Sequence, residues 1–227
     1  MTVPVTRRMP AVLGALALAA AVAACSGNTA ATSGVPPSAE PAPSGAASTC
    51  PTSQPDSLPA GETRTVTIET DLGSIDIALE ADLSPIAAGN FVALAECGYY
   101  DGVVFHRVVP GFVIQAGDGQ YGRKSSLDPN LVGTGGPGYT IQDEVVSVTY
   151  ERGIVAMART RAPDSVGSQF FIVLDDAARG SLEQANTYQI IGRVTAGIET
   201  ADAIAAAADA EIPSDPVEMT DVSVANP

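Results

Sequence analysis

Arg107 stands out among the residues able to do chemistry, because its permanent charge lies within an apolar run, residues 103–109. Such a side chain is either paired or faces a polar groove. His106, the only histidine of the chain, lies in the same run, where we expect a buried structural imidazole rather than the base of a nucleophilic site. No cluster of His, Cys, Asp and Glu has the spacing of metal ligands, so the sequence predicts no metal site.

A glycine-rich run, residues 133–138, matches the pattern G-x-G-x-x-G on paper. It follows no strand-like run, precedes no helical run and contains Pro137, so it lacks the context of a dinucleotide site. We predict a turn-forming loop there, and no cofactor.

Three segments carry a more specific pattern. They are residues 105–118 (FHRVVPGFVIQAGD), residues 133–139 followed by Asp143 and Glu144, and residues 157–158 (MA) followed by 167–172 (GSQFFI). Their order and separations resemble those of the cyclophilin-type peptidyl-prolyl cis/trans isomerases, and the likeness covers residues 63–224. The resemblance implies a closed eight-stranded antiparallel β-barrel capped by two helices, with a peptide groove on its outer surface. It also implies that the clients are proline-containing polypeptides.

The chemistry of that family needs no nucleophile. Rotation about a peptide C–N bond has a barrier of ~18–20 kcal/mol, because resonance holds the bond planar. Both isomers of an X-Pro bond are populated and their exchange is slow. A guanidinium that donates a hydrogen bond to the prolyl nitrogen stabilises its lone pair mainly in the twisted state, and so lowers the barrier.

The resemblance also implies a role for individual residues. Arg107 would donate to the prolyl nitrogen, and Gln115 would bond to the substrate backbone near the rotating carbonyl. The apolar slot for the proline ring would be formed by Phe112, Val113 and Phe171. The remaining substrate contacts would come from the main chain at Ala158 and Arg159 and from the wall residues Leu182 and Tyr188.

Two departures from the family pattern leave an alternative open. Arg159 stands where the family usually has Asn, and the Trp of the proline-pocket wall is absent, since the chain contains no Trp. We therefore expect weak binding of cyclosporin-type ligands, for lack of an indole N–H donor. The alternative function is a non-catalytic scaffold or chaperone that binds proline peptides on the same fold.

Hydrophobic periodicity predicts the elements around these residues. Alternation over 65–69 and 75–79, with a turn at 71–74, predicts a β-hairpin. Ser84 followed by Pro85 predicts the start of a helix, with a hydroxyl N-cap and Pro at N1, that ends near Gly98. The other expected elements are strands at 103–109, 112–116, 154–158, 169–174, 188–194 and 217–224, and an Ala-rich helix at 198–208. Many strands with two helices predict an antiparallel barrel or sandwich.

Residues 1–24 have the features of an export signal, with Arg7 and Arg8 before an apolar run too short to span a bilayer. The sequence VAAC at 22–25 resembles a bacterial lipobox, which implies acylation of Cys25 and anchoring at the outer face of the cell membrane. The alternative is ordinary secretion with cleavage nearby. We predict a flexible linker rich in Ser, Ala and Pro over 25–62 and the isomerase domain over 63–227.

Charge and cysteine content narrow the partners. Loss of residues 1–24 removes two arginines and no acidic residue, which changes the net charge from −15 to −17. Such an acidic domain repels nucleic acid and anionic lipid headgroups, so we expect no nucleic-acid partner and membrane contact only through the lipid. We also expect a monomer. Cys50 and Cys97 would lie in a compartment where disulfides persist, which favours a bond between them over two free thiols. A thiol-redox role is disfavoured because no C-x-x-C motif is present.

Overall fold

The computed structural model describes residues 49–185 and 187–225. The predicted signal peptide, the acylated Cys25 and the first part of the predicted linker lie outside these residues. The described part contains these strands and helices: β1 Thr63–Thr70, β2 Gly73–Glu80, α1 Pro85–Glu96, β3 Arg107–Val109, β4 Val113–Ala116, η1 Lys124–Ser126, β5 Ile154–Met157, β6 Phe170–Val173, η2 Asp176–Ala178, α2 Arg179–Ala185, β7 Ile190–Ala196, α3 Ile198–Ala207 and β8 Asp221–Val224. None of these helices is both long enough and apolar enough to cross a bilayer.

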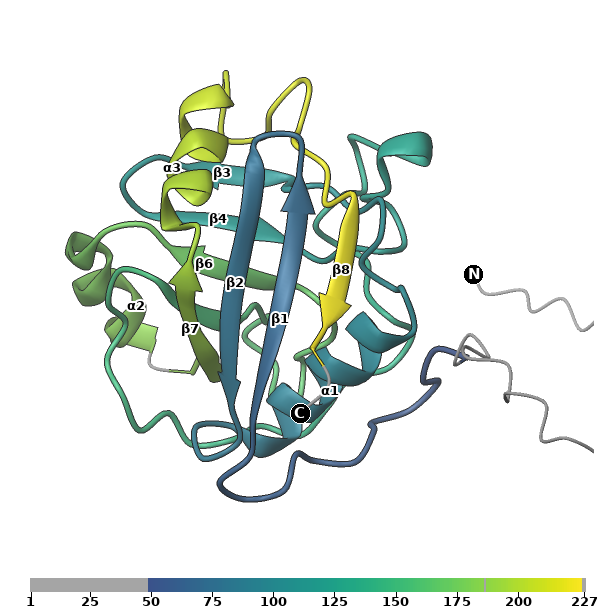
Figure 1. The fold of residues 1–227 in the computed structure, drawn as a ribbon, viewed down its shortest axis with the longest axis vertical. Helices are drawn as coiled ribbons and strands as arrows, with labels where there is room; N and C mark the ends of the chain where they lie inside the picture. Colours follow the sequence, from purple (N-terminus) through teal and green to yellow (C-terminus); the bar gives the residue numbers. More distant parts are fainter. Residues whose placement is uncertain (1–48, 186, 226–227) are drawn as a thin grey trace, which may run out of the picture. The chain divides into compact units, whose positions relative to one another are not determined.

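All eight strands form one antiparallel sheet, in the order β3-β4-β6-β5-β7-β2-β1-β8. The sheet is strongly curved. In Figure 1, β1, β2 and β8 run vertically, while β3, β4 and β6 cross behind them. The predicted mainly β architecture with eight antiparallel strands is therefore confirmed, and so is the hairpin, in which Thr70 is paired with Gly73.

The predicted closed barrel is wrong, because the sheet is an open half-barrel whose edge strands, β3 and β8, do not pair. The segments before these strands do pair: besides an isolated bridge between Val104 and Glu218, three backbone hydrogen bonds connect residues 102–105 with residues 217–219. The backbone of the predicted strand 103–109 also bonds to two loops. Val104 N–H donates to the carbonyl of Gly122, and Val108 N–H donates to the carbonyl of Glu211, both at 2.8 Å. The pairing with residues 217–219 thus involves residues 102–105 and does not extend into β3, where Val108 bonds to a loop.

The main core lies inside the curve of the sheet, and aromatic rings occupy its centre. Phe91 of α1 stacks on Tyr100, with ring centroids 4.8 Å apart, and meets Phe170 of β6 edge-on at 5.1 Å. All three side chains are fully buried. This packing fixes α1 against β6, the strand that also carries Phe171 on its opposite face.

Helix α1 begins at Pro85, as predicted, but Ser84 makes no capping hydrogen bond with its side chain. The carboxylate of Glu144 does this instead, accepting from the N–H groups of Ile86 and Ala87, both at 2.9 Å. A negative charge at the first turn also favours the helix dipole. The cap therefore comes from a loop 58 residues away, which local sequence cannot reveal.

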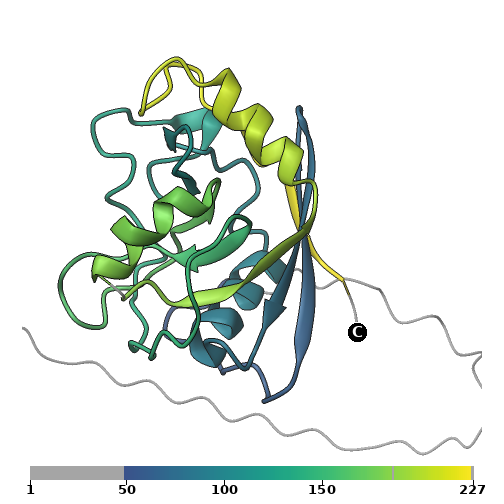
Figure 2. The same cartoon turned by 90° about the vertical axis from the view of Figure 1, so that its left-hand side faces the viewer.

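The prediction of two helices omitted α2, a third and shorter one. Only Leu182 of its seven residues is buried, so it presents no apolar periodicity. Figure 2 shows α2 on the opposite side of the domain from β1 and β2, with α3 lying across one end.

The last part of the predicted linker packs on the domain. We call residues 50–58 the N-terminal strap. Cys50 forms a disulfide with Cys97, at the end of α1. Leu58 is buried, and its N–H donates to the carbonyl of Pro85 at 3.0 Å, at the start of the same helix. The strap therefore runs along the whole of α1.

Candidate functional site

Arg107, Gln115 and Phe171 form a row across three strands. In the ladder registers, Arg107 of β3 is opposite Gln115 of β4, and Gln115 is opposite Phe171 of β6. Residues opposite each other in antiparallel strands project from the same face of the sheet. Their neighbours Val108, Ile114 and Phe170 enter the main core. The three predicted site residues therefore lie together on the outer face.

Next to this row lies a second hydrophobic cluster, which we call the outer cluster. Its predicted members are Phe112, Val113, Ala158, Phe171, Leu182 and Tyr188, and they are joined by Tyr150, Ile154, Ala156, Val173 and Ile190, among others. Tyr188 packs edge-on against Phe171, with ring centroids 5.3 Å apart. Leu182 of α2 is buried there, while Phe112 and Tyr188 are only half-buried. The structure thus brings the three residues predicted for the slot and three others predicted to contact substrate into one patch with an accessible edge.

Arg107 is partly exposed and is held from one side. Its Nε donates to Glu211 Oε1 at 2.8 Å, and 36% of the arginine side chain remains exposed. Among the described residues no protein group accepts from its two Nη atoms. Nε is one of the five N–H donors of a guanidinium, so the end of the side chain keeps free donors. Sequence reasoning missed Glu211, which is 104 residues away in a loop without periodic pattern.

Gln115 connects the row to the glycine-rich loop. Its Nε2 donates to Gln169 Oε1 at 2.9 Å. Gln169 in turn donates to the carbonyls of Gly133 and Gly135, at 3.0 and 2.9 Å. The fully buried carboxylate of Asp118 accepts from the N–H groups of the same two glycines. The run 133–138 is therefore a loop, as predicted, and it is wrapped around Asp118.

A cavity of about 790 Å³ lies between that loop and residues 158–169. Its lining includes Gln115, Thr134, Tyr139, Ala158 and Gln169. Because Gln115 belongs to both the row and the lining, the cavity adjoins the row. No group of three or more His, Cys, Asp or Glu side chains in the described residues is arranged to hold a metal ion.

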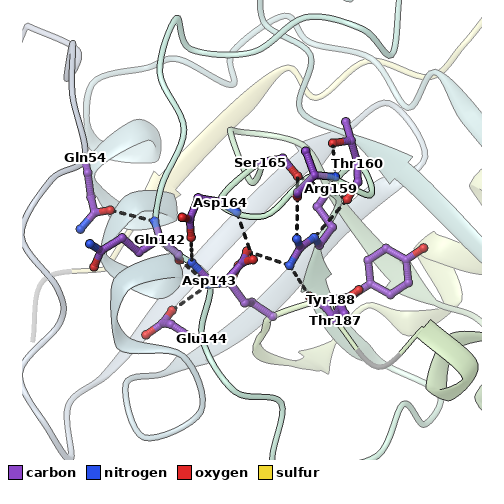
Figure 3. Close-up of polar contacts among 12 residues, drawn as sticks. Gln54, Gln142, Asp143, Glu144, Arg159, Thr160, Asp164, Ser165, Thr187 and Tyr188 are labelled. Carbon is purple, nitrogen blue, oxygen red and sulfur yellow. Dashed lines mark hydrogen bonds and ion pairs between the residues drawn. The ribbon is translucent and has the colours of Figure 1, made fainter.

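Arg159 is placed differently from the other predicted residues. Only 8% of its side chain is exposed, and Nη1 pairs with Asp143 Oδ1 at 2.7 Å (Figure 3). The residue as a whole is half-exposed, so the main chain is the accessible part. The predicted substrate contact at the backbone of Arg159 stays a prediction, while the guanidinium is bound by groups of the protein itself.

His106 is buried, with 4% of the residue exposed, and lies beside the glycine-rich loop. A Cβ on Gly133 would be 3.4 Å from its Nε2, so the loop passes directly over the ring. Burial lowers the pKa of His106 below its ordinary value. A neutral imidazole inside the fold fits the structural role predicted for it.

Comparison with known proteins gives one consistent result. Residues 65–224 match the family model described as cyclophilin type peptidyl-prolyl cis-trans isomerase/CLD. A probable peptidyl-prolyl cis-trans isomerase of Brucella suis is 36% identical over 149 residues, which are 65% of this chain and 74% of the relative. Peptidyl-prolyl cis-trans isomerase B of Bacillus subtilis is 39% identical over 133 residues, covering 58% of this chain and 82% of that protein.

Solved structures agree with the sequence comparison. The crystal structure of a cyclophilin type isomerase from Cryptosporidium parvum superposes with a TM-score of 0.60 at 32% identity, covering 73% of this chain and 100% of that chain. The same protein in the presence of the dipeptide Ala-Pro gives a TM-score of 0.59 at 31% identity, over 72% and 99% of the two chains.

Proposed function

This chain belongs to the cyclophilin-type peptidyl-prolyl cis-trans isomerase family, and we propose that it rotates X-Pro bonds at the row formed by Arg107, Gln115 and Phe171. The single observation that carries this proposal is the register that aligns these three side chains beside the outer cluster. A charged donor, a neutral polar group and an apolar slot then act on one peptide.

In the proposed mechanism the proline ring sits in the slot of Phe112, Val113 and Phe171 while the bond before it twists. Burying an apolar ring there holds one side of the bond, at roughly 25 cal/mol per Å² of apolar surface removed from water. The structure of the Cryptosporidium relative in the presence of the dipeptide Ala-Pro supports a ligand of this class.

Arg107 provides the differential stabilisation in this mechanism. As the amide leaves planarity, the prolyl nitrogen regains a lone pair that accepts a hydrogen bond from an Nη group of Arg107. That bond is stronger in the twisted state than in either planar isomer, so it lowers the barrier. Glu211 holds the guanidinium by Nε and leaves the Nη groups for the substrate, which supports this assignment.

We further propose that the clients are exported proteins and that Cys25 carries the lipid that anchors the enzyme at the outer face of the membrane. The lipobox-like sequence before Cys25 and the apolar run before it support this. The Cys50–Cys97 disulfide is compatible with an oxidising compartment.

A protease-coupled assay with an X-Pro peptide tests the proposed activity and mechanism. We expect the wild-type protein to accelerate exchange and Arg107→Ala to lower kcat/KM by about 100-fold or more, as loss of a transition-state donor does. Arg193→Ala is the matched control, because this exposed arginine pairs with Glu80 and belongs to neither the row, the outer cluster nor the cavity lining. Binding of the peptide by the wild type without acceleration would instead favour the scaffold function.

A further inference from the structure

The guanidinium of Arg159 is surrounded by acceptors from its own protein. Nε donates to the carbonyl of Thr160 at 3.1 Å, and Nη2 donates to that of Ala162 at 2.7 Å. Nη1 donates to the carbonyl of Thr187 at 3.4 Å and pairs with Asp143. Figure 3 shows these contacts converging on one planar group. All three nitrogens of the guanidinium bind acceptors of the protein, so this arginine, unlike Arg107, has no free nitrogen for a substrate.

Asp143 is in turn hydrogen-bonded to Asp164. Asp143 N–H donates to Asp164 Oδ1 at 2.8 Å, and Asp164 N–H donates to Asp143 Oδ2 at 3.0 Å. Asp164 has a φ of 51°, the only positive φ of a non-glycine residue in the described chain. The backbone of a non-glycine residue is strained at a positive φ, and this conformation persists only where surrounding contacts hold it. The paired bonds with Asp143 are such a constraint.

The network therefore joins three segments that are distant in sequence: the loop at Asp143, residues 159–165, and Thr187 with the neighbouring Tyr188. Each of them borders the candidate site. Ala158, Thr160 and Ser165 line the cavity, and Tyr188 belongs to the outer cluster. Gln142, next to Asp143, also donates from its N–H to Gln54 of the N-terminal strap at 2.9 Å. Figure 3 shows the line of contacts from the strap to the rim of the site.

Loss of the guanidinium would leave acceptors without a donor in all three segments. Two carboxylates, Asp143 and Asp164, would face each other without a cation, and three carbonyl groups would lose a donor. Lysine cannot replace the arginine, because a single ammonium does not span four acceptors with the fixed fork of a guanidinium.

We propose that Arg159 is a positioning residue that fixes the main chain of 158–165 as the rim against which the substrate backbone aligns, with Asp143 as its anchor. This inference rests on the proposed function. The guanidinium acts through the rim and not on the reacting bond, so its loss weakens peptide binding and leaves the barrier in the bound state largely unchanged.

Isomerase kinetics on the full chain test this. For Arg159→Gln and Arg159→Lys we expect KM to rise about fivefold or more, with kcat within about twofold of wild type, the signature of lost uniform binding. Arg193→Gln, which removes an exposed pair with Glu80, is the control and should change neither constant. Amide hydrogen exchange of residues 160–165 should accelerate in both Arg159 variants and not in the control.

The milder variant Asp143→Asn keeps the shape of the anchor and removes its charge, so it decides the question if the Arg159 variants do not fold. It should raise KM and add little to the effect of Arg159→Gln in the double variant. Wild-type KM in Arg159→Gln, or rescue by lysine, would overturn the rim role while leaving isomerase activity intact. An inactive wild type would overturn the proposed function itself.

Discussion

The two arginines at the site have opposite hydrogen-bond arrangements, and these indicate their roles. Arg107 uses Nε on Glu211 and keeps its Nη groups at an accessible surface. Arg159 is 8% exposed in its side chain and gives every nitrogen to the protein. A donor that is already satisfied cannot stabilise a transition state, whereas a free and oriented donor can. The family resemblance already assigned the guanidinium of Arg107 and the main chain of Arg159 to the site, but only the contacts show what the guanidinium of Arg159 binds.

The ion-pair partners of Arg107 and Arg159 could not be predicted from the sequence, for a physical reason. Arg107, Gln115 and Phe171 fall in motifs, and strand alternation restricts the face on which each can lie. Glu211 and Asp143 come from loops, where no period relates a residue to its neighbours in space. Their carboxylates look like the other acidic residues of a chain with 26 of them.

His106 makes stability depend on pH. Burial lowers the pKa of His106 below 6.5; Arg107 adds to this and Asp118 opposes it. The unfolded chain therefore takes up a proton near pH 6.5 that the folded protein binds only at lower pH. The free energy of unfolding should fall below that pH, with a slope of up to about 1.4 kcal/mol per pH unit from this group. Urea unfolding at several pH values should show this slope in wild type and its loss in His106→Gln. Identical pH profiles for the two proteins would contradict this assignment.

At the scale of elements, the strands and the two longer helices follow from periodicity, because an apolar face must repeat every two residues or every 3.6. The errors lie where one contact decides the outcome. The α1 cap comes from Glu144 rather than Ser84, and α2 is held by Leu182 alone. The N-terminal strap was assigned to a linker because its composition is polar, yet a disulfide and the buried Leu58 fix it to α1.

The Cys50–Cys97 bond should contribute substantially to stability. It closes a loop with a sequence separation of 47 residues, which restricts the unfolded chain. Replacing both cysteines with serine should lower the free energy of unfolding by about 2–4 kcal/mol. Urea denaturation of the wild type, with and without reductant, and of the double variant measures this. We expect the reduced wild type to match the double variant. A loss below about 0.5 kcal/mol would show that the strap is already held by its other contacts.

For the whole molecule, the family resemblance predicted the eight-stranded antiparallel architecture, but neither the open sheet nor helix α2. The eight strands and their antiparallel pairing are as predicted, and the gap between β3 and β8 is not. Backbone hydrogen bonds join residues 102–105 to residues 217–219, but this pairing does not extend into β3, where Val108 N–H donates to the carbonyl of Glu211. The sequence could not reveal where this pairing ends, because the partner of Val108 lies in a loop without periodic pattern.

The proposed anchor is a property of the whole chain and can be tested by cell fractionation. Cys25→Ser should move the protein from the membrane fraction to the soluble fraction, because the acyl group is the only proposed attachment. The Cys50→Ser/Cys97→Ser double variant is the control and should stay with the membrane. Retention of Cys25→Ser in the membrane fraction would contradict acylation at this residue.

The most direct test of the central claim separates binding from rotation at Arg107. NMR exchange spectroscopy on a proline peptide at saturating concentration gives the cis/trans exchange rate in the bound state, and a titration gives the affinity. We predict that Arg107→Ala binds the peptide within about tenfold of wild type but loses about 100-fold or more of the bound exchange rate. Exchange by Arg107→Ala at the wild-type rate would show that the guanidinium does not assist the rotation.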